Sequence, residues 1–315
     1  MTWPSWRADV EREVEFAMKT VDRVFADPSL LQMSRQALAN DGHCRADAPD
    51  VQIAALSFEQ FYVSRLTTLV QSKGNFWGGK DAELAHKCSW SRAAALLSAE
   101  TARRLLHEGI VVLDGALTSA EAAAARAEIA QLDRGGQLKE VEAQSKARVR
   151  NDKIGWIGAG DQASADFPAL HLAARLLRAI PHEVEKACGA GWRLACPKVV
   201  MAAVYDGSPQ RPTYYTKHFD GGPPGGGSGN PRKLTVILYL NEEPWDVARD
   251  GGCLRAYLPR TGAGRGADSG AQYMDVVPVA GRMLLFDSQR IEHEVLPSYR
   301  RRAAVTLWAN GLDLA

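Results

Sequence analysis

The chain has 315 residues, of which 46% are hydrophobic and 24% charged, and its formal net charge is +1. This composition is ordinary for a globular protein, and the near-neutral charge gives no indication of a nucleic-acid or membrane partner. The five cysteines are odd in number and lack C-x-x-C spacing, which argues against a disulfide framework or structural zinc and favours a reducing compartment.

Residues 1–90 carry mainly helical signals. Apolar residues at helical spacing predict a helix over Val10–Phe25 that ends near Asp27-Pro28, and a second helix over Leu56–Val70. We find neither a signal-peptide core nor an apolar run long enough to span a bilayer, so we expect a cytoplasmic protein that could also be nuclear. Four possible metal-binding side chains match no zinc-finger spacing and are interpreted as ordinary residues: His43, Cys44, His86 and Cys88.

The next segment combines helices with a short strand. A helix is predicted over Ser91–Glu108, ended by Gly109 and followed by a strand at Ile110–Leu113. Thr118-Ser-Ala-Glu121 is a capping box that opens a helix reaching about Leu132.

Two further segments lead to the β-rich half. Gln137–Val149 is polar and predicts a mobile hairpin, after which Arg150–Ile157 turns apolar and leads into a strand. Phe167–Cys188 is amphipathic and predicts a helix with a kink, or two abutting helices, at Pro181. We interpret its two histidines, at positions 171 and 182, as structural.

Short β-type runs separated by turn signals fill the remainder. They predict an α+β protein: a double-stranded β-helix (jelly roll) core with supporting helices and a helical N-terminal extension. The glycine-rich segment 221–231 cannot pack a core and is expected to form a loop. The runs are Lys198–Tyr205, Tyr214–Phe219, Leu234–Leu240, Cys253–Tyr257, Met283–Phe286 and Ala303–Trp308.

The candidate metal ligands are His218, Asp220 and His293. On a strand, residues i and i+2 face the same side, so His218 and Asp220 could reach one metal together. Two imidazoles and one carboxylate suit Fe(II), because they hold one face of an octahedron and leave three positions open. Arg302, nine residues after His293, opens an apolar strand and needs an anion if buried. A dicarboxylic co-substrate would supply it, and Thr306 on the same strand face could add a hydroxyl donor.

Over about residues 95–310 these features resemble the 2-oxoglutarate/Fe(II) dioxygenase superfamily, and within it the HIF-type prolyl 4-hydroxylases (HIF, hypoxia-inducible factor). The resemblance implies Fe(II), 2-oxoglutarate and O2, with ascorbate as reductant. It also implies that Arg302, Tyr239, Tyr205 and Thr306 surround the 2-oxoglutarate. The same resemblance marks four substrate-contacting residues: Arg150 and Asp152 in Arg-x-Asp-Lys-Ile-x-Trp-Ile, then Trp308 and Arg232.

The resulting hypothesis is a catalytic domain at residues 91–315 that hydroxylates a prolyl residue of an intracellular protein, in connection with oxygen sensing. Its partner would be a protein or peptide carrying the target proline, without nucleic acid or membrane, and we expect a monomer. Two alternatives stay open: the same chemistry on another side chain or a small molecule, and a non-catalytic jelly-roll binding protein. Residues 1–90 have no assigned role.

Overall fold

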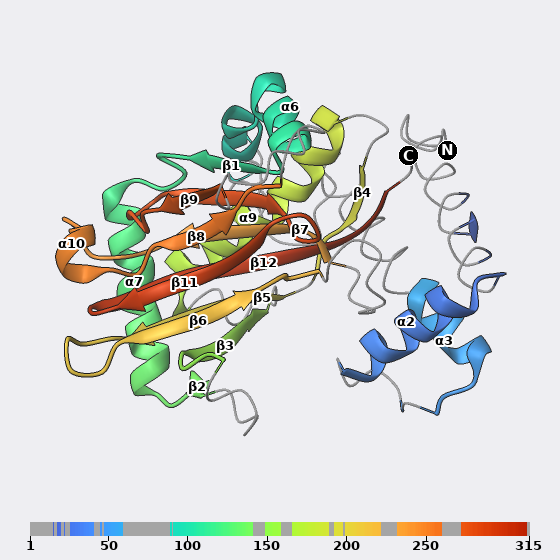
Figure 1. The fold of residues 1–315 in the computed structure, drawn as a ribbon, viewed down its shortest axis with the longest axis horizontal. Helices are drawn as coiled ribbons and strands as arrows, with labels where there is room; N and C mark the ends of the chain where they lie inside the picture. Colours follow the sequence, from blue (N-terminus) through green and yellow to red (C-terminus); the bar gives the residue numbers. More distant parts are fainter. Residues whose placement is uncertain are drawn as a thin grey trace, which may run out of the picture.

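The computed structural model describes residues 26–40, 47–58, 91–140, 149–158, 166–188, 192–197, 199–221, 232–259 and 272–313, with a few single positions before residue 91. Within these ranges the strands form two antiparallel sheets that face each other, and helices cover the outer side of the larger sheet (Figure 1). The arrangement is a jelly roll supported by helices, as the sequence predicted.

In the larger sheet, an early strand and the last strand of the β-rich half of the chain are neighbours. All strand pairs in both sheets are antiparallel. The smaller sheet has the order β6 (Thr213–His218), β11 (Glu292–Ser298), β8 (Leu254–Tyr257), β9 (Tyr273–Val276). The larger sheet has the order β1 (Ile110–Leu113), β10 (Met283–Asp287), β7 (Arg232–Tyr239), β12 (Arg301–Asp313), β5 (Val199–Asp206), β3 (Lys153–Gly158), β2 (Lys139–Glu140), and β4 (Trp192–Ala195) pairs with β12.

The central strands of the larger sheet are buried on both faces, because they separate the core under the helices from the core between the sheets. Successive side chains of a strand point to opposite faces. On β7, Leu234, Val236 and Leu238 therefore join the core under the helices, whereas Ile237 and Tyr239 join the core between the sheets. The same alternation on β12 directs its even-numbered residues, from position 302 to 308, into the space between the sheets.

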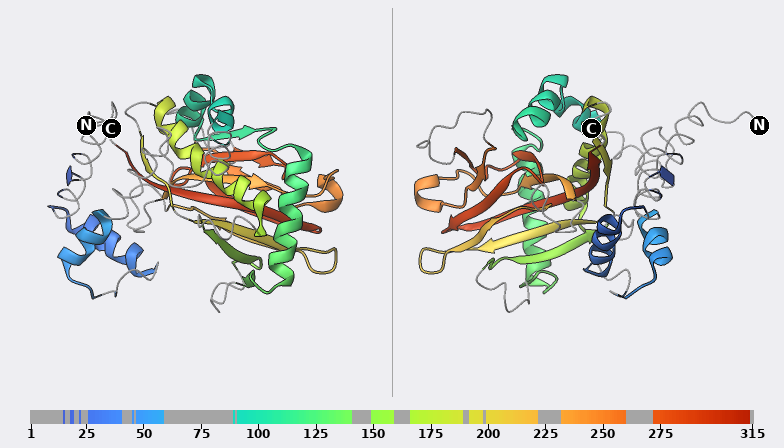
Figure 2. Two further views of the ribbon diagram at one scale, coloured as in Figure 1. Left: turned by 180° about the vertical axis from the view of Figure 1, so that it is seen from behind. Right: turned by 45° about the vertical axis from the view of Figure 1, so that its right-hand side comes forward.

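Three helices form the outer layer: α6 (Ala99–Glu108), α7 (Ser119–Arg134) and α9 (Pro168–Cys188). Seen from behind, α7 and α9 cross the outer face of the larger sheet (Figure 2, left). The predicted caps are confirmed. Gly109 ends α6 with a φ of 81°, and Thr118 and Glu121 form the capping box of α7. A short helix, α10 (Val247–Asp250), precedes β8.

The described part of the N-terminal region contains α2 (Pro28–Asn40) and α3 (Asp50–Phe58). These helices pack on each other around Leu38, Ala48 and Ile53, which form a small cluster of their own. None of the helices in the described ranges is long and apolar enough to cross a membrane.

The predicted helix end near Asp27-Pro28 agrees with the described positions, because residues 15, 18, 19, 22 and 26 are helical and residue 27 is not. A new helix, α2, begins there, because the Asp27 carboxylate accepts the Ser29 N–H at 2.9 Å and proline suits the first helical turn. Another helix prediction needs correction. The predicted helix over Ser91–Glu108 is interrupted, because Ser98 caps the first turn of α6. Of the two alternatives at Pro181, two abutting helices are not found: α9 is one helix through Pro181, whose buried neighbours on both sides pack into the same core.

Several predictions fall outside the described residues. These are most of Val10–Phe25, the part of Leu56–Val70 beyond Phe58, the four non-zinc side chains His43, Cys44, His86 and Cys88, most of the polar segment 137–149, and most of the glycine-rich segment.

Candidate metal and co-substrate site

The two candidate histidines face each other across one strand pair. His218 ends β6 and His293 lies near the start of β11, and the two are directly opposite in the antiparallel register. Opposed residues in such a pair project to the same face. Their ring centroids are therefore only 4.3 Å apart, although the residues are far apart in the sequence.

Asp220 reaches the same point by a different route from the one predicted. It lies beyond the end of β6, so the alternation of a strand does not place it. Instead, its Oδ2 accepts a hydrogen bond from Thr235 Oγ1 on β7 at 2.8 Å. The next residue, Gly221, donates its N–H to the Ser288 carbonyl at 2.9 Å. A Cβ on Gly221 would lie 2.2 Å from the Arg232 carbonyl oxygen, so this turn requires glycine.

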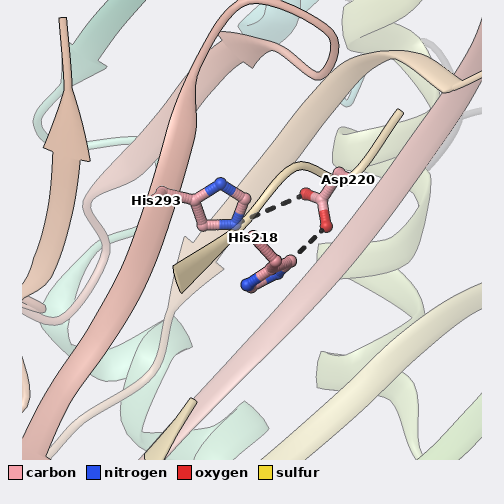
Figure 3. Close-up of side chains that lie close together, drawn as sticks. All are labelled: His218, Asp220 and His293. Carbon is pink, nitrogen blue, oxygen red and sulfur yellow. Dashed lines mark ion pairs between the residues drawn. The ribbon is translucent and has the colours of Figure 1, made fainter. Parts of the chain in front are cut away.

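Backbone carbonyls fix which imidazole nitrogen faces Asp220. His218 Nδ1 lies 2.7 Å from the Thr216 oxygen, and His293 Nδ1 lies 3.2 Å from the Ile291 oxygen. Because a carbonyl oxygen can only accept, each Nδ1 carries a proton, and Nε2 is the nitrogen left to face Asp220 and to offer a lone pair to a metal. The two Nε2 atoms lie 3.5 and 3.7 Å from the Asp220 oxygens (Figure 3).

This set of donors fits a divalent cation. The ligand atoms of the three residues lie within 4.8 Å of one another, and at least one from each is a lone-pair donor. Two imidazoles with one carboxylate are also the donor combination of non-haem Fe(II) sites.

Burial acts in opposite directions on the two kinds of ligand. Desolvation lowers the pKa of His293 to about 4, with partial compensation by Asp220, so the imidazole is neutral at neutral pH. Burial alone would raise the pKa of Asp220, but attraction by His293 and a hydrogen bond with His218 outweigh it and hold the pKa well below its ordinary value. Both groups are thus in the protonation state that binds a metal.

Arg302 lies at the inner end of a cavity of about 150 Å³ that the three candidate ligands also line. Its side chain is buried, and its Nε donates to the Gly252 carbonyl at 3.0 Å. Gly252 has a φ of 71°, which favours glycine. The guanidinium carbon lies 5.0 and 5.1 Å from the ring centroids of Tyr205 and Tyr239.

Three hydroxyl-bearing residues lie near this arginine or line the same cavity. Tyr205 and Thr306 line the cavity, and Tyr239 is fully buried beside Arg302. Among the described residues, the Tyr239 hydroxyl has no hydrogen-bond partner. Burial raises the pKa of Tyr239 to about 12, so the hydroxyl stays protonated and is a donor. A buried donor without a partner beside a buried cation fits an anionic ligand.

The predicted substrate-contacting residues lie at the mouth of the cavity, except for one. Arg150, Arg232 and Trp308 line it, and the Arg232 guanidinium lies 4.2 Å from the Trp308 ring centroid. Asp152 does not line the cavity. It holds Arg150 through two hydrogen bonds of 2.6 and 2.5 Å.

Several residues of the candidate site were not predicted from the sequence. Tyr215 stacks on the His218 ring at 3.7 Å, with Arg150 over its other face at 4.5 Å. Thr235 contacts Asp220, and Trp156, 57% exposed, also lines the cavity. A signal for Thr235 was available, because it lies two strand positions from Ile237 and four from Tyr239 and so shares their face.

Comparisons with known proteins agree with this geometry. The family model described as the 2OG-Fe(II) oxygenase superfamily matches residues 200–310. Mouse prolyl hydroxylase EGLN3 is 30% identical over 221 residues, which cover 64% of this chain and 79% of that protein. The hypoxia-inducible factor prolyl hydroxylase of Caenorhabditis elegans is 31% identical over 220 residues, or 67% of this chain and 28% of that protein.

Two solved structures share the fold. A prolyl hydroxylase from Trichoplax adhaerens, in complex with a hypoxia-inducible factor peptide, has a TM-score of 0.55 and 23% identity, covering 74% of this chain and 94% of that one. A Pseudomonas putida prolyl-4-hydroxylase has a TM-score of 0.52 and 24% identity, covering 69% of this chain and 98% of that one.

The chain spans only part of several curated relatives. It covers 28% of the C. elegans protein and 45%, 38% and 36% of Egl nine homolog 1 from rat, mouse and human.

Proposed function

The chain belongs to the 2OG-Fe(II) oxygenase superfamily, in the family of the hypoxia-inducible factor prolyl hydroxylases, and we propose that it hydroxylates a prolyl residue of a protein substrate. Members of this superfamily use Fe(II), 2-oxoglutarate and O2. The observation that carries the proposal is the convergence of two imidazoles, a carboxylate and a buried arginine on one cavity.

The metal would be held by His218, Asp220 and His293. Bound there, Fe(II) supplies the oxygen chemistry that couples conversion of 2-oxoglutarate to succinate and CO2 with hydroxylation of a C–H bond. The role of the three side chains is to present two uncharged nitrogens and one negative oxygen. Their backbone and Thr235 contacts fix these atoms before the metal arrives.

The inner end of the cavity would bind the distal carboxylate of 2-oxoglutarate. Arg302 offers a planar pair of N–H donors that matches a carboxylate, and Gly252 holds the guanidinium from behind. The protonated Tyr239 hydroxyl would donate a further hydrogen bond, and we assign Thr306 and Tyr205 to the same ligand. Burial of these groups excludes water and strengthens each interaction.

The mouth of the cavity would receive the substrate peptide. Trp308 with Arg232 and Tyr215 with Arg150 line it as two arginine–aromatic pairs, so aromatic faces are available for a proline ring. Asp152 fixes Arg150 and so contributes indirectly. The T. adhaerens relative was solved with a hypoxia-inducible factor peptide, which supports a peptide substrate here.

The test is Fe(II)-dependent turnover of 2-oxoglutarate by the full chain under air, with and without ascorbate. Succinate is measured with proline-containing peptides and, separately, with free amino acids. We expect release coupled to peptide and the addition of one oxygen atom to a prolyl residue, located by mass spectrometry. Proteins that remain bound to a His293→Ala variant in cell extract identify the natural target.

Other outcomes redirect the assignment. Coupled turnover with a free amino acid alone would show the same chemistry on a small molecule. If no substrate gives Fe(II)-dependent turnover, the result would contradict catalysis and favour a non-catalytic binding protein. A role in oxygen sensing requires that the rate rise with O2 across the physiological range. Monomeric state and location in the cytoplasm or nucleus remain predictions.

A further inference from the structure

Two fully buried hydroxyl groups lie directly behind Asp220. Thr235 is on β7 and Ser288 follows the end of β10, and both side chains are 0% exposed. Thr235 Oγ1 lies 2.8 Å from Asp220 Oδ2 and 2.8 Å from Ser288 Oγ. The three groups form a line that leads away from the cavity into the larger sheet.

The direction of these hydrogen bonds follows from counting protons. An ionised carboxylate can only accept, so Thr235 donates its single hydroxyl proton to Asp220 Oδ2. Thr235 has no second proton to give to Ser288. Ser288 must therefore donate to the Thr235 oxygen, and the relay runs from Ser288 to Thr235 to Asp220.

Ser288 is held in turn by β7. Its N–H donates to the Lys233 carbonyl at 2.9 Å, and the Lys233 ammonium pairs with the preceding residue, Asp287, at 2.9 Å. Both charged side chains are almost completely buried. Such a pair is a poor source of stability, because desolvation cancels most of the attraction, but it fixes positions strongly. It clamps the turn that leads from β10 to β11 and its His293.

Asp220 needs such support, because it lies outside a strand and no sheet ladder sets its side chain. We propose that Thr235 and Ser288 are positioning residues of the metal centre, which set the rotation of the Asp220 carboxylate before the metal binds. The inference rests on the proposed function, since it requires a metal at His218, Asp220 and His293. Hydrogen-bond partners of ligands commonly change metal affinity by about 10- to 100-fold.

The test measures metal binding rather than activity. Mn(II) is titrated into the metal-free full chain, and the Co(II)-loaded chain gives a visible spectrum that reports ligand geometry. We expect Thr235→Val to weaken Mn(II) binding by about 10- to 100-fold and to alter the Co(II) spectrum, and Thr235→Ser to restore both. Thr213→Val is the matched control, because Thr213 is also buried and its hydroxyl has no partner. It should bind Mn(II) like the unmodified chain.

Ser288→Ala tests the relay itself. It should weaken Mn(II) binding in the unmodified chain and have no further effect beside Thr235→Val, because the relay is already broken there. Thermal unfolding of the metal-free variants separates a local change from a folding defect. If Thr235→Val also lowers the midpoint, the single Ser288→Ala variant and the Thr235→Ser rescue decide.

The outcomes separate this inference from the proposed function. An unmodified chain that does not bind Mn(II) or Co(II) would contradict the metal centre and the relay with it. Binding by the unmodified chain, with Thr235→Val equal to it within about two-fold, would overturn only the positioning role. Additive effects of the two substitutions would likewise overturn the relay while leaving the metal centre intact.

Discussion

At the scale of single residues, a substitution of Tyr239 can separate an effect on co-substrate binding from an effect on protein stability. Its hydroxyl is buried without a partner, so the folded protein alone gains nothing from it. Tyr239→Phe should therefore leave the thermal midpoint unchanged or raise it. The same substitution should weaken 2-oxoglutarate binding by about 10- to 100-fold, the loss of one hydrogen bond to a charged acceptor. Titration calorimetry with Mn(II) in place of Fe(II) measures the affinity.

The control for this prediction is Tyr257→Phe. Tyr257 lies on β8 outside the cavity, and its hydroxyl donates to Glu294. Tyr257→Phe should leave the affinity for 2-oxoglutarate unchanged. If Tyr239→Phe also leaves this affinity unchanged, Tyr239 does not bind the co-substrate.

Residue types explain which parts of the site could be predicted from sequence. His218, Asp220, His293 and Arg302 could be proposed from sequence, because few other functions need imidazole, carboxylate and guanidinium in that order. Thr235 was not found, because a threonine inside a β run is equally typical of a sheet core. Only the structure brings its hydroxyl against Asp220.

At the scale of elements, the register between β6 and β11 is the decisive feature that sequence could not supply. It pairs His218 with His293, and a slip of one residue would move one histidine to the opposite face. The strand ranges of β5, β6, β7, β8 and β10 agreed with prediction to within two residues, because alternation is a local signal. Register depends on contacts between segments that are distant in the sequence. The short strands β4 and β9 also depend on such contacts, and they were not predicted.

The α10 turn gives a prediction about pH. Hydrogen bonds from Arg249, opposed by burial and joined by bonds from the Asp246 N–H and Arg300, hold the pKa of Asp250 well below its ordinary value. The unfolded chain therefore binds this proton more readily, and acid favours unfolding. The stabilisation is complete above the unfolded pKa of about 4 and is lost as the pH falls further.

Asp250→Asn should thus reduce the free energy of unfolding at pH 7 by about 1–3 kcal/mol. The difference from the unmodified chain should shrink as the pH is lowered from 5 towards 3, measured by urea denaturation at each pH. Asp275→Asn is the control, because Asp275 pairs with Arg255 at the surface, where such pairs contribute less than about 1 kcal/mol. A difference for Asp250→Asn that stays constant with pH would contradict the assignment.

The same turn connects stability to the site. Asp250 is followed by Gly251 and Gly252, and the Gly252 carbonyl accepts the Nε proton of Arg302. The Asp250 carbonyl also accepts the Tyr299 N–H at 2.8 Å, which fixes the start of β12. The position of the Arg302 side chain thus depends on this turn. Gly251 and Gly252 determine its shape, and the Asp250 carboxylate holds it in place.

At the scale of the whole molecule, the two hydrophobic cores of the jelly roll and the cluster of α2 and α3 involve different segments. In the described part of the chain, the residues of the main core begin at Ala93, and Ser89 is also buried. Leu38, Ala48 and Ile53 belong to the separate N-terminal cluster. We therefore predict that residues 85–315 fold without the N-terminal region.

Two shortened chains test whether the catalytic domain folds without the N-terminal region. A chain of residues 85–315 should keep the thermal midpoint and bind Mn(II) and 2-oxoglutarate within about two-fold of the full chain, because the described residues of both sites and cores are retained. A chain starting at residue 104 loses Ala93, Leu97 and Ala102 from the main core and should not fold cooperatively, since the loss of a large buried side chain such as Leu97 alone costs about 2–5 kcal/mol. If the longer fragment also unfolds or loses 2-oxoglutarate, the N-terminal helices are part of the catalytic unit, and the boundary near residue 90 is wrong.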